Sequence, residues 1–168
     1  MDPKRNQRCC FTGHRPEKLK MPEHEIKDWL NRQIDQAIAD GLVTFISGCA
    51  MGVDIWAAQI VLKKRESNSN LHLIAATPYP GFGYRWKEEW KEQYHRLLKD
   101  ADLVRTICEK YTEDCFSKRN HWIVDHSCRV IALYNGETGG TQETIDYAVE
   151  SGIEVVQLIP GVTPETVV

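Results

Sequence analysis

Two glycine-rich segments of the chain carry the residue types that hold a phosphate group. Residues 47–54 read Ser-Gly-Cys-Ala-Met-Gly-Val-Asp, and residues 135–141 read Asn-Gly-Glu-Thr-Gly-Gly-Thr; a helical pattern follows each segment. Glycine lets the backbone come close to a ligand, and the first N–H groups of a helix are unpaired and partly positive. Because both segments repeat this chemistry, we favour a shared anion site over the alternative that the glycines only permit tight turns.

A third segment, Thr12–Arg15, follows the first strand-like run of the sequence. We expect it to close a third side of the anion site. The guanidinium of Arg15 suits a phosphate or a carboxylate, which it binds through two parallel hydrogen bonds. The structural alternative is a solvated loop in which Arg15 forms a salt bridge with an acidic neighbour such as Glu17.

Four charged or amide side chains have both a ligand-binding and a structural interpretation. Arg119 and Asn120 either clamp a phosphate or form the solvent-facing side of a helix. Asp54 begins a helix, where we favour a capping or orienting role over a ligand contact. Glu143, in the first turn of the last helical segment, either complements the helix dipole or faces the ligand. If the chain is an enzyme, Glu143 and Arg119 are its candidate catalytic residues.

A group of aromatic residues borders the same predicted edge. Tyr79, Phe82 and Tyr84 lie in a segment rich in proline and glycine, and they are candidates to stack on a nucleobase or to form a lid. Trp86 and Trp90 share one helical stripe and are expected in the core. An interface with a protein partner or with a second copy of the chain is the alternative use of the exposed aromatic residues. The complete set of predicted ligand-binding residues is Thr12, Gly13, His14, Arg15, Ser47, Gly48, Ala50, Gly52, Asp54, Pro78, Tyr79, Arg119, Asn120, Asn135, Gly139, Gly140, Thr141 and Thr144.

Neither familiar phosphate fingerprint is present. Residues 47–52 do not read G-x-G-x-x-G, and no acidic residue ends the second strand-like run to hold a ribose. The G-x-x-x-x-G-K-[ST] pattern is absent too. A nicotinamide-dependent dehydrogenase and a P-loop ATPase are therefore disfavoured, and no cofactor is expected to be required beyond a nucleotide-like ligand.

Short apolar runs alternate with amphipathic segments along the chain. Most runs are nearly continuous, as is typical of parallel strands covered on both faces. This order predicts a single Rossmann-like α/β domain over residues 1–168, with a doubly wound, mainly parallel sheet of about six strands and helices on both faces. Ligands bind such sheets outside the carboxyl ends of the strands, where the three segments lie. The predicted strands are Arg8–Thr12, Leu42–Ser47, Leu71–Ala76, Leu103–Ile107, Arg129–Tyr134 and Glu154–Ile159, and the predicted helices lie near 26–38, 53–65, 86–101, 115–126 and 141–151.

Composition and charge disfavour several other classes of protein. The formal net charge of −3 gives no general attraction to polyanions, so nucleic-acid binding is disfavoured. No apolar run approaches the ~20 residues of a membrane span, and the polar start Met1–Gln7 lacks the apolar core of a secretory signal, so we expect a cytoplasmic protein without membrane contact. No two of the six cysteines form a C-x-x-C pair, so we expect free thiols and no metal site. Cys9, Cys10 and Cys128 are expected inside strands, as small buried apolar residues.

Four motifs, taken together in their order and spacing, resemble the YpsA-like family. They read F-T-G-H-R-P at 11–16, S-G-x-A-x-G-V-D at 47–54, R-N-x-x-x-V-D at 119–125 and G-G-T-x-x-T at 139–144, and the resemblance runs from about Cys9 to Ile159. The family belongs to a wider group that includes DprA and the LOG-type nucleotide phosphoribohydrolases. The resemblance implies a Rossmann-like fold that binds a nucleotide or a nucleotide-derived ligand at the glycine segments. It also implies a bacterial or prophage origin and a link to cell division or stress.

The chain departs from the LOG-type enzymes at one motif. Their pattern reads G-G-x-G-T-x-x-E, whereas here Thr141 follows the glycine pair directly and Glu143 lies two residues after the threonine instead of three. One position along a helix rotates a side chain by about 100°. The resemblance therefore leaves a catalytic role of Glu143 open.

We rank three functions from the sequence. The first is a binding module that senses a nucleotide derivative and acts through a protein partner. The second is a phosphoribohydrolase-like enzyme that cleaves the N-glycosidic bond of a nucleotide, with Glu143 as the acid/base or the oxocarbenium-stabilising group and Arg119 as the phosphate clamp. The third is DprA-like binding of single-stranded DNA, against which the acidic balance of the chain counts.

Overall fold

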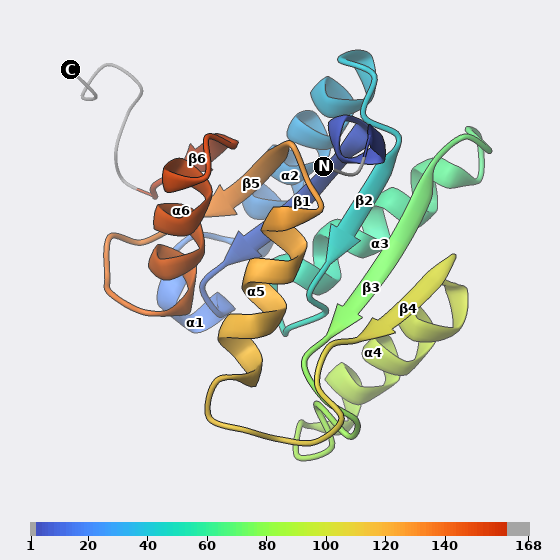
Figure 1. The fold of residues 1–168 in the computed structure, drawn as a ribbon. Coiled ribbons are helices and arrows are strands. Elements are labelled where there is room, and N and C mark those ends of the chain that lie inside the picture. Colours follow the sequence, from blue (N-terminus) through green and yellow to red (C-terminus); the bar gives the residue numbers. More distant parts are fainter. Residues whose placement is uncertain (1–2, 161–168) are drawn as a thin grey trace.

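Six parallel strands form one sheet in the computed structural model, which describes residues 3–160 (Figure 1). A short 3₁₀ segment, Pro3–Gln7, leads into the first strand. The two ends of the predicted domain, residues 1–2 and 161–168, lie outside the described range. The strands are β1 (Arg8–Gly13), β2 (Thr44–Ser47), β3 (His72–Thr77), β4 (Leu103–Thr106), β5 (Arg129–Leu133) and β6 (Glu154–Leu158), and the helices are α1 (Pro16–Leu19), α2 (Glu23–Ala39), α3 (Val53–Arg65), α4 (Glu88–Asp100), α5 (Cys115–Asp125) and α6 (Gly140–Glu150).

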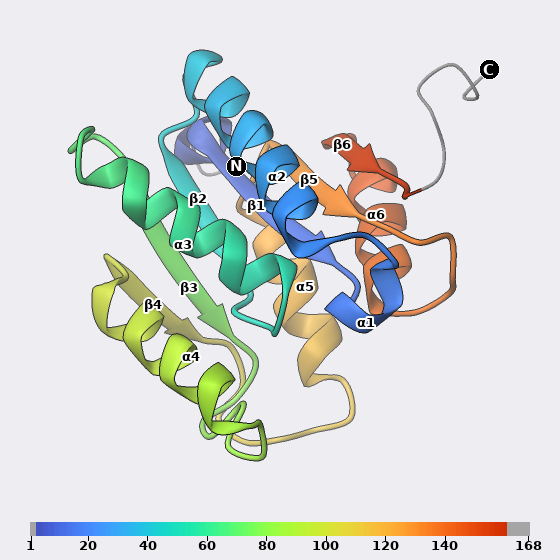
Figure 2. The same cartoon turned by 180° about the vertical axis from the view of Figure 1, so that it is seen from behind.

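The strands follow the order β4-β3-β2-β1-β5-β6 across the sheet. From β1 the chain moves outward through β2, β3 and β4, and it then returns through α5 to place β5 on the other side of β1. Cys9 of β1 is consequently in register with both Phe45 of β2 and Arg129 of β5. Helices α2, α3 and α4 cover one face of the sheet (Figure 2), and α5 and α6 cover the other (Figure 1). The predicted Rossmann-like, doubly wound sheet is confirmed, and its switch point lies between β1 and β5.

Successive residues of the central strand β1 point into two different cores. Cys9 and Phe11 join the larger core with α2, α3 and α4, where the ring of Phe11 stacks on Phe45 of β2 with centroids 6.0 Å apart. Cys10 joins the smaller core, which includes Ile123 of α5. Both faces of β1 are therefore buried, and this is why its sequence is continuously apolar instead of alternating.

The edge strand β4 is an exception to the expectation that most strands are covered on both faces. All four of its residues are exposed, and Leu103 and Val104 keep 50% and 41% of their surface in contact with solvent. β4 pairs with β3 alone, because it lies at the end of the sheet. The apolar run predicts the strand correctly, but the strand's place in the sheet comes from the path of the chain.

Several predicted boundaries are also wrong. The second strand begins at Thr44, because the N–H of Leu42 instead donates to the carbonyl of Ala37 and closes the end of α2. The helix predicted near 86–101 is α4, and it begins at Glu88. Trp86 instead ends a turn, in which its N–H donates to the carbonyl of Gly83. Cys128 precedes β5 and is only partly buried. The four-residue helix α1 was not predicted, because it is too short to show a helical period.

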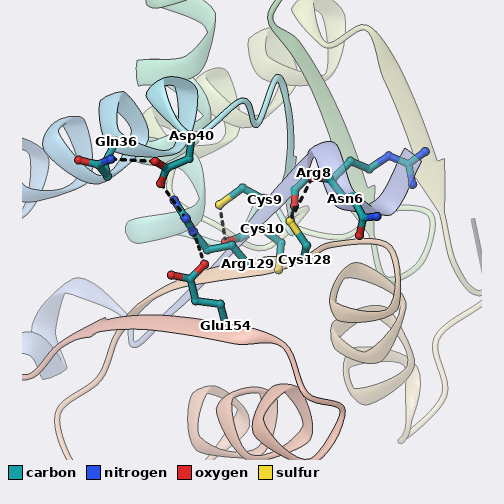
Figure 3. Close-up of polar contacts among 9 residues, drawn as sticks. All are labelled: Asn6, Arg8, Cys9, Cys10, Gln36, Asp40, Cys128, Arg129 and Glu154. Atoms are coloured by element: carbon teal, nitrogen blue, oxygen red, sulfur yellow. Dashed lines mark hydrogen bonds and ion pairs between the residues drawn. The ribbon is translucent and has the colours of Figure 1, made fainter. Parts of the chain in front are cut away.

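An ion-pair network ties the opposite, amino-terminal edge of the sheet together (Figure 3). Nη2 of Arg129, at the start of β5, lies 2.8 Å from a carboxylate oxygen of Asp40, and its Nε lies 2.7 Å from one of Glu154 at the start of β6. Gln36 donates a further bond to Asp40 at 3.0 Å. The bonds from Arg129 and Gln36 hold the pKa of Asp40 below its ordinary value. The network joins the end of α2 to two strands, far from the loops that we predict to bind a ligand.

The thiol groups of the cysteines near this edge contact backbone carbonyl oxygens. Sγ of Cys128 donates to the carbonyl of Arg8 at 3.4 Å, and Sγ of Cys9 lies 3.7 Å from the carbonyl of Cys10 (Figure 3). Burial raises the pKa of Cys10 to about 12, so this thiol stays protonated. All six cysteines are free. Within residues 3–160, no helix is long and apolar enough to cross a membrane.

Candidate functional site

A cavity of about 290 Å³ lies at the carboxyl edge of the sheet, between the loops that follow β1 and β5. We call it the switch-point cavity, since the path of the chain across the sheet reverses there. The loop after β1 with α1, the start of α3, the first turns of α5 and the start of α6 form its walls. Its lining residues are Phe11, Thr12, Gly13, His14, Arg15, Lys18, Ala50, Asp54, Phe116, Arg119, Asn120, Thr138, Gly139, Gly140 and Thr141.

The structure brings most of the predicted ligand-binding residues together in this cavity. Thr12–Arg15, Ala50, Asp54 and Gly139–Thr141 come from the three predicted segments, and Arg119 and Asn120 come from α5. Glu143 lies in the first turn of α6, exposed to solvent and outside the lining. The predicted binding residues that also lie outside the lining are Ser47, Gly48, Gly52, Pro78, Tyr79, Asn135 and Thr144.

Three residues outside the lining hold the loops in shape through their side chains. Each donates a hydrogen bond to a backbone carbonyl of a helix, in α3, α1 or α6. The bonds run from Ser47 to Asp54 (2.8 Å), from Asn135 to Lys18 (3.1 Å) and from Thr144 to Gly140 (2.7 Å).

Gly48 and Gly52 lie in tight contact with other parts of the chain. A Cβ atom at Gly48 would lie 2.9 Å from Cζ of Arg119 and 3.0 Å from Oδ2 of Asp54. A Cβ atom at Gly52, whose φ is +92°, would lie 2.7 Å from Cδ of Pro16. Both glycines therefore let two segments of the protein approach each other, and it is the neighbouring Ala50 and Asp54 that reach the switch-point cavity.

Arg119 is buried, with only 5% of its surface exposed. Its Nη1 donates to the carbonyl oxygens of Gly48 and Ala76, and its Nε donates to the side-chain oxygen of Asn120 at 2.9 Å. The solvent-facing alternative for Arg119 is therefore wrong. The guanidinium connects α5 to the loop after β2 and to the end of β3, and Arg119 lines the switch-point cavity.

The carboxyl group of Asp54 is buried beside this guanidinium. Its Oδ2 accepts a hydrogen bond from the N–H of Ala50 at 3.3 Å, so the carboxyl group orients the loop before its own helix, although it does not cap the helix. Burial raises the pKa of Asp54 to about 6, and the charge of Arg119 and the Ala50 N–H oppose this rise. Its second oxygen, Oδ1, is buried and has no hydrogen-bond partner among residues 3–160.

His14 carries a second buried polar atom without a partner. The imidazole stacks on Tyr134 with ring centroids 5.6 Å apart, and only 7% of the residue is exposed. Burial and the nearby charge of Lys18 lower the pKa of His14, so the ring is neutral at pH 7. Across the described part of the chain, Nε2 of His14 and Oδ1 of Asp54 are the buried side-chain polar atoms that lack a partner, and both residues line the switch-point cavity.

The start of α6 forms an open wall of the same cavity. No side chain caps this helix. A Cβ atom at Gly139 would meet nothing within 4 Å, and one at Gly140 would have Nδ2 of Asn120 as its nearest neighbour, at 3.9 Å. The unpaired N–H groups of the first turn and the exposed cations Arg15 and Lys18 favour a negative charge here. No ion pair between Arg15 and Glu17 is present in the described structure.

A second, larger groove of about 510 Å³ lies between α3 and α4. It is lined by long side chains such as Gln59, Arg65 and Arg96, and Gln59 is hydrogen-bonded across it to Gln93 at 2.9 Å. It holds no predicted site residue and neither of the two unpartnered buried atoms. We therefore take the smaller cavity as the candidate functional site. In the described range no cluster of three or more His, Cys, Asp or Glu residues has the geometry of a metal site.

Residues 9–154 match the YpsA family, which is described as the YspA SLOG family. The chain belongs to this family. Among its curated relatives, a UPF0398 protein of Bacillus cereus is 30% identical over 150 residues, which cover 84% of this chain and 80% of the relative. A UPF0398 protein of Halalkalibacterium halodurans is 28% identical over 139 residues, covering 78% and 74%. The resemblance read from the four motifs is thereby confirmed.

Two solved structures of DNA processing protein A (DprA) share the fold of this YpsA-family chain. The protein from Streptococcus pneumoniae superposes with a TM-score of 0.58 at 19% identity, over 95% of this chain and 52% of the DprA chain. The Helicobacter pylori protein, whose structure was described for its mode of binding single-stranded DNA, gives a TM-score of 0.63 at 17% identity, over 89% and 64%. The chain thus spans roughly half to two thirds of the length of these neighbours, and at this identity the likeness shows the fold alone.

Sequence reasoning missed several lining residues of this YpsA-family site, and Phe116 is the most prominent. It lies three residues before Arg119 on α5, so both side chains occupy the same face of that helix. This spacing was the available signal, but it applies equally to a core residue. Lys18 lies on the unpredicted helix α1, whereas Phe11 and Thr138 lie in segments that the sequence singled out but were not among the predicted binding residues.

Proposed function

We propose that the chain binds a nucleotide or a nucleotide-derived phosphate ligand in the switch-point cavity and works as a sensor or regulatory module. The observation that carries this proposal is the pair of unpartnered buried atoms, Nε2 of His14 and Oδ1 of Asp54, in one cavity. A buried polar atom without a hydrogen bond costs ~1–3 kcal/mol. A ligand that supplies a donor to Asp54 and a hydroxyl to His14 would remove both costs, and the hydroxyl groups of a sugar can do this.

The phosphate would lie at the other end of the same cavity. The start of α6 offers N–H groups beside Gly139 and Gly140, where no side chain fills the space. Arg15 and Lys18 are exposed at the rim. An anion is favoured at a helix N-terminus by ~0.3–1 kcal/mol even on an open surface, and each cation adds to this. The groups that we propose for the sugar and for the phosphate thus line a single cavity.

The position of Glu143 outside the cavity favours a sensing function over hydrolysis. In the hydrolase hypothesis Glu143 is the acid/base group beside the sugar, but Glu143 is exposed and outside the cavity lining. Asp54 is the carboxyl group that reaches the cavity, where the N–H of Ala50 binds its Oδ2. Its position suits a hydrogen bond to the ligand.

Native mass spectrometry of the purified chain, followed by calorimetry with AMP, GMP, CMP, UMP and ribose 5-phosphate, tests the proposal. We expect a retained or titratable ligand, and we expect His14→Phe, which keeps the stack on Tyr134 but removes Nε2, to weaken binding about 10-fold. His24→Phe, at an exposed position of α2, is the matched control and should leave the Kd within about twofold. If the wild-type chain binds no member of this panel and retains no small molecule, the proposal is wrong. Release of free base during incubation would instead favour the hydrolase.

Single-stranded DNA is the second candidate ligand. The Helicobacter pylori neighbour, which was described in its mode of binding single-stranded DNA, has this fold, and exposed aromatic residues such as Tyr84 and Tyr111 lie beyond the carboxyl edge here. The net charge of −3 argues against a strong electrostatic component. Fluorescence anisotropy of a labelled oligothymidylate at about 50 and 200 mM salt separates the candidates, since phosphate contacts make affinity fall steeply with salt. We expect no binding at either concentration.

A further inference from the structure

Phe116 is an exposed aromatic residue at the mouth of the switch-point cavity. It lies in the first turn of α5, lines the cavity, and keeps 38% of its surface in contact with solvent. The two residues that follow it on the same helix face, Arg119 and Asn120, line the cavity as well. A phenylalanine that was needed only for packing would be expected in the core, where burial of its ring stabilises the fold.

Other aromatic rings hold Phe116 in place. Its ring meets Tyr79 edge-to-face, at 6.0 Å between centroids and 88° between planes, and it meets Phe82 at 5.8 Å and 65°. Tyr79 is in turn contacted by Phe82 and by Tyr111. A ring supported in this way loses little conformational entropy when a second flat group stacks on its free surface.

The sequence made the loop residues Tyr79, Phe82 and Tyr84 candidates for base stacking or for a lid, and the structure places none of the three in the cavity lining. Phe82 is 8% exposed and packs in the core, and its ring also lies 5.9 Å from Cζ of Arg119. Tyr84 is 60% exposed but stands outside the cavity. The loop therefore supports the aromatic surface, and Phe116 is the residue that presents it to a ligand.

The size of the cavity agrees with a ligand that extends beyond it. At about 290 Å³ it lies just below the range for ligand pockets, which is ~300–1,000 Å³. A sugar and a phosphate would occupy the polar interior between His14, Asp54 and the start of α6. A group attached to the sugar would then leave through the mouth, which Phe116 borders.

We infer that Phe116 stacks on the base of the ligand, and that the switch-point cavity therefore takes a complete nucleotide in preference to a bare sugar phosphate. The inference rests on the proposed function, since it assumes that the sugar and phosphate occupy the interior of the cavity. It adds to that function the base as a source of affinity. Stacking on an aromatic side chain contributes to binding for every base, so Phe116 provides affinity for nucleotides as a class and not for one of them.

Calorimetry with AMP and with ribose 5-phosphate tests the inference on the full chain. We expect the wild type to bind AMP on the order of 10-fold more tightly than ribose 5-phosphate. Phe116→Leu keeps an apolar side chain but removes the flat ring, so it should reduce this ratio to within twofold while the Kd for ribose 5-phosphate stays unchanged. Phe116→Tyr should retain the ratio. Tyr84→Leu, an exposed aromatic position of the same edge outside the cavity, is the matched control and should also retain it.

The outcomes separate this inference from the proposed function. Equal affinity of the wild type for AMP and ribose 5-phosphate overturns the stacking role and leaves the proposed function intact; because this comparison needs no variant, it holds even if Phe116→Leu does not fold. A Phe116→Leu protein that keeps the 10-fold preference overturns it too. If the wild type binds neither compound, both the proposed function and the inference fail.

Discussion

Arg119 and Asp54 face each other across Gly48, and no larger residue fits between them without a shift of one of the two charged groups. The carbonyl of Gly48 accepts a hydrogen bond from Arg119, and a Cβ atom there would lie 3.0 Å from Oδ2 of Asp54. The loop after β2, the start of α3 and the middle of α5 thereby meet at two buried charged groups. The same arrangement forms the floor of the switch-point cavity.

Gly48→Ala should destabilise the protein by about 1–3 kcal/mol, since the added methyl group overpacks a site bounded by Arg119 and Asp54. Gly140→Ala is the comparison, because its Cβ would lie 3.9 Å from the nearest atom, at the first position of α6. We expect this variant to change the free energy of unfolding by less than about 0.5 kcal/mol. Urea denaturation of both variants measures the difference, and equal losses would contradict the packing that we describe.

Asp54→Asn should raise the free energy of unfolding at pH 7 by about 1–3 kcal/mol, because the folded state then no longer buries a charge. In the wild type the pKa of Asp54 rises from 3.8 to about 6 on folding. Between these pH values the folded state holds a proton that the unfolded state has released, so this group makes stability fall as the pH rises. Denaturation at pH 4, 5, 6 and 7 should show a pH-dependent gap between the two proteins. A constant gap would count against the raised pKa.

Arg119→Met should destabilise the protein more at pH 8 than at pH 5. At pH 8 Asp54 is ionised, and the substitution removes the positive charge of Arg119 that offsets the burial of this carboxylate. Removal of one of two neighbouring buried charges costs about 3 kcal/mol or more. At pH 5 most of Asp54 is protonated, and the loss is mainly that of the hydrogen bonds to Gly48 and Ala76. Adding Asp54→Asn should recover part of the stability at pH 8. Additive effects of the two substitutions would contradict their interaction.

Arg129→Met, at the opposite edge of the sheet, should lower stability without affecting ligand binding. It removes the ion pairs to Asp40 and Glu154. The pKa of Asp40 is held below 3.8 by Arg129, so its contribution is present above that pH and is lost as the pH falls through the lowered pKa. The difference in thermal stability from the wild type should therefore be smaller at pH 2.5 than at pH 7. A changed Kd for AMP would show that the two edges are coupled.

The six strands and five of the six helices follow from local patterns in the sequence. The apolar run at Arg8–Gly13 and the helical period through Ile26 and Ile34 depend on neighbours within a few residues of one another, so they can be recognised without a structure. The short helix α1 cannot, because four residues do not complete a period. The position of β4 at the edge cannot either, since it depends on how the whole chain crosses the sheet.

The sequence alone determined that Thr12–Arg15, Ala50 with Asp54, and Gly139–Thr141 would come together, because parallel strands bring their carboxyl ends to one edge of the sheet. Only the tertiary structure decided what each residue does there. Gly48 belongs to the predicted anion site by sequence. In the structure, however, its carbonyl accepts a hydrogen bond from the guanidinium of Arg119, 71 residues further along the chain. Phe116 has no distinctive local pattern, and it becomes a site residue only because α5 crosses the mouth of the cavity. Backbone positions at the edge of a sheet follow from local periodicity, whereas the partner of a side chain depends on contacts between distant segments.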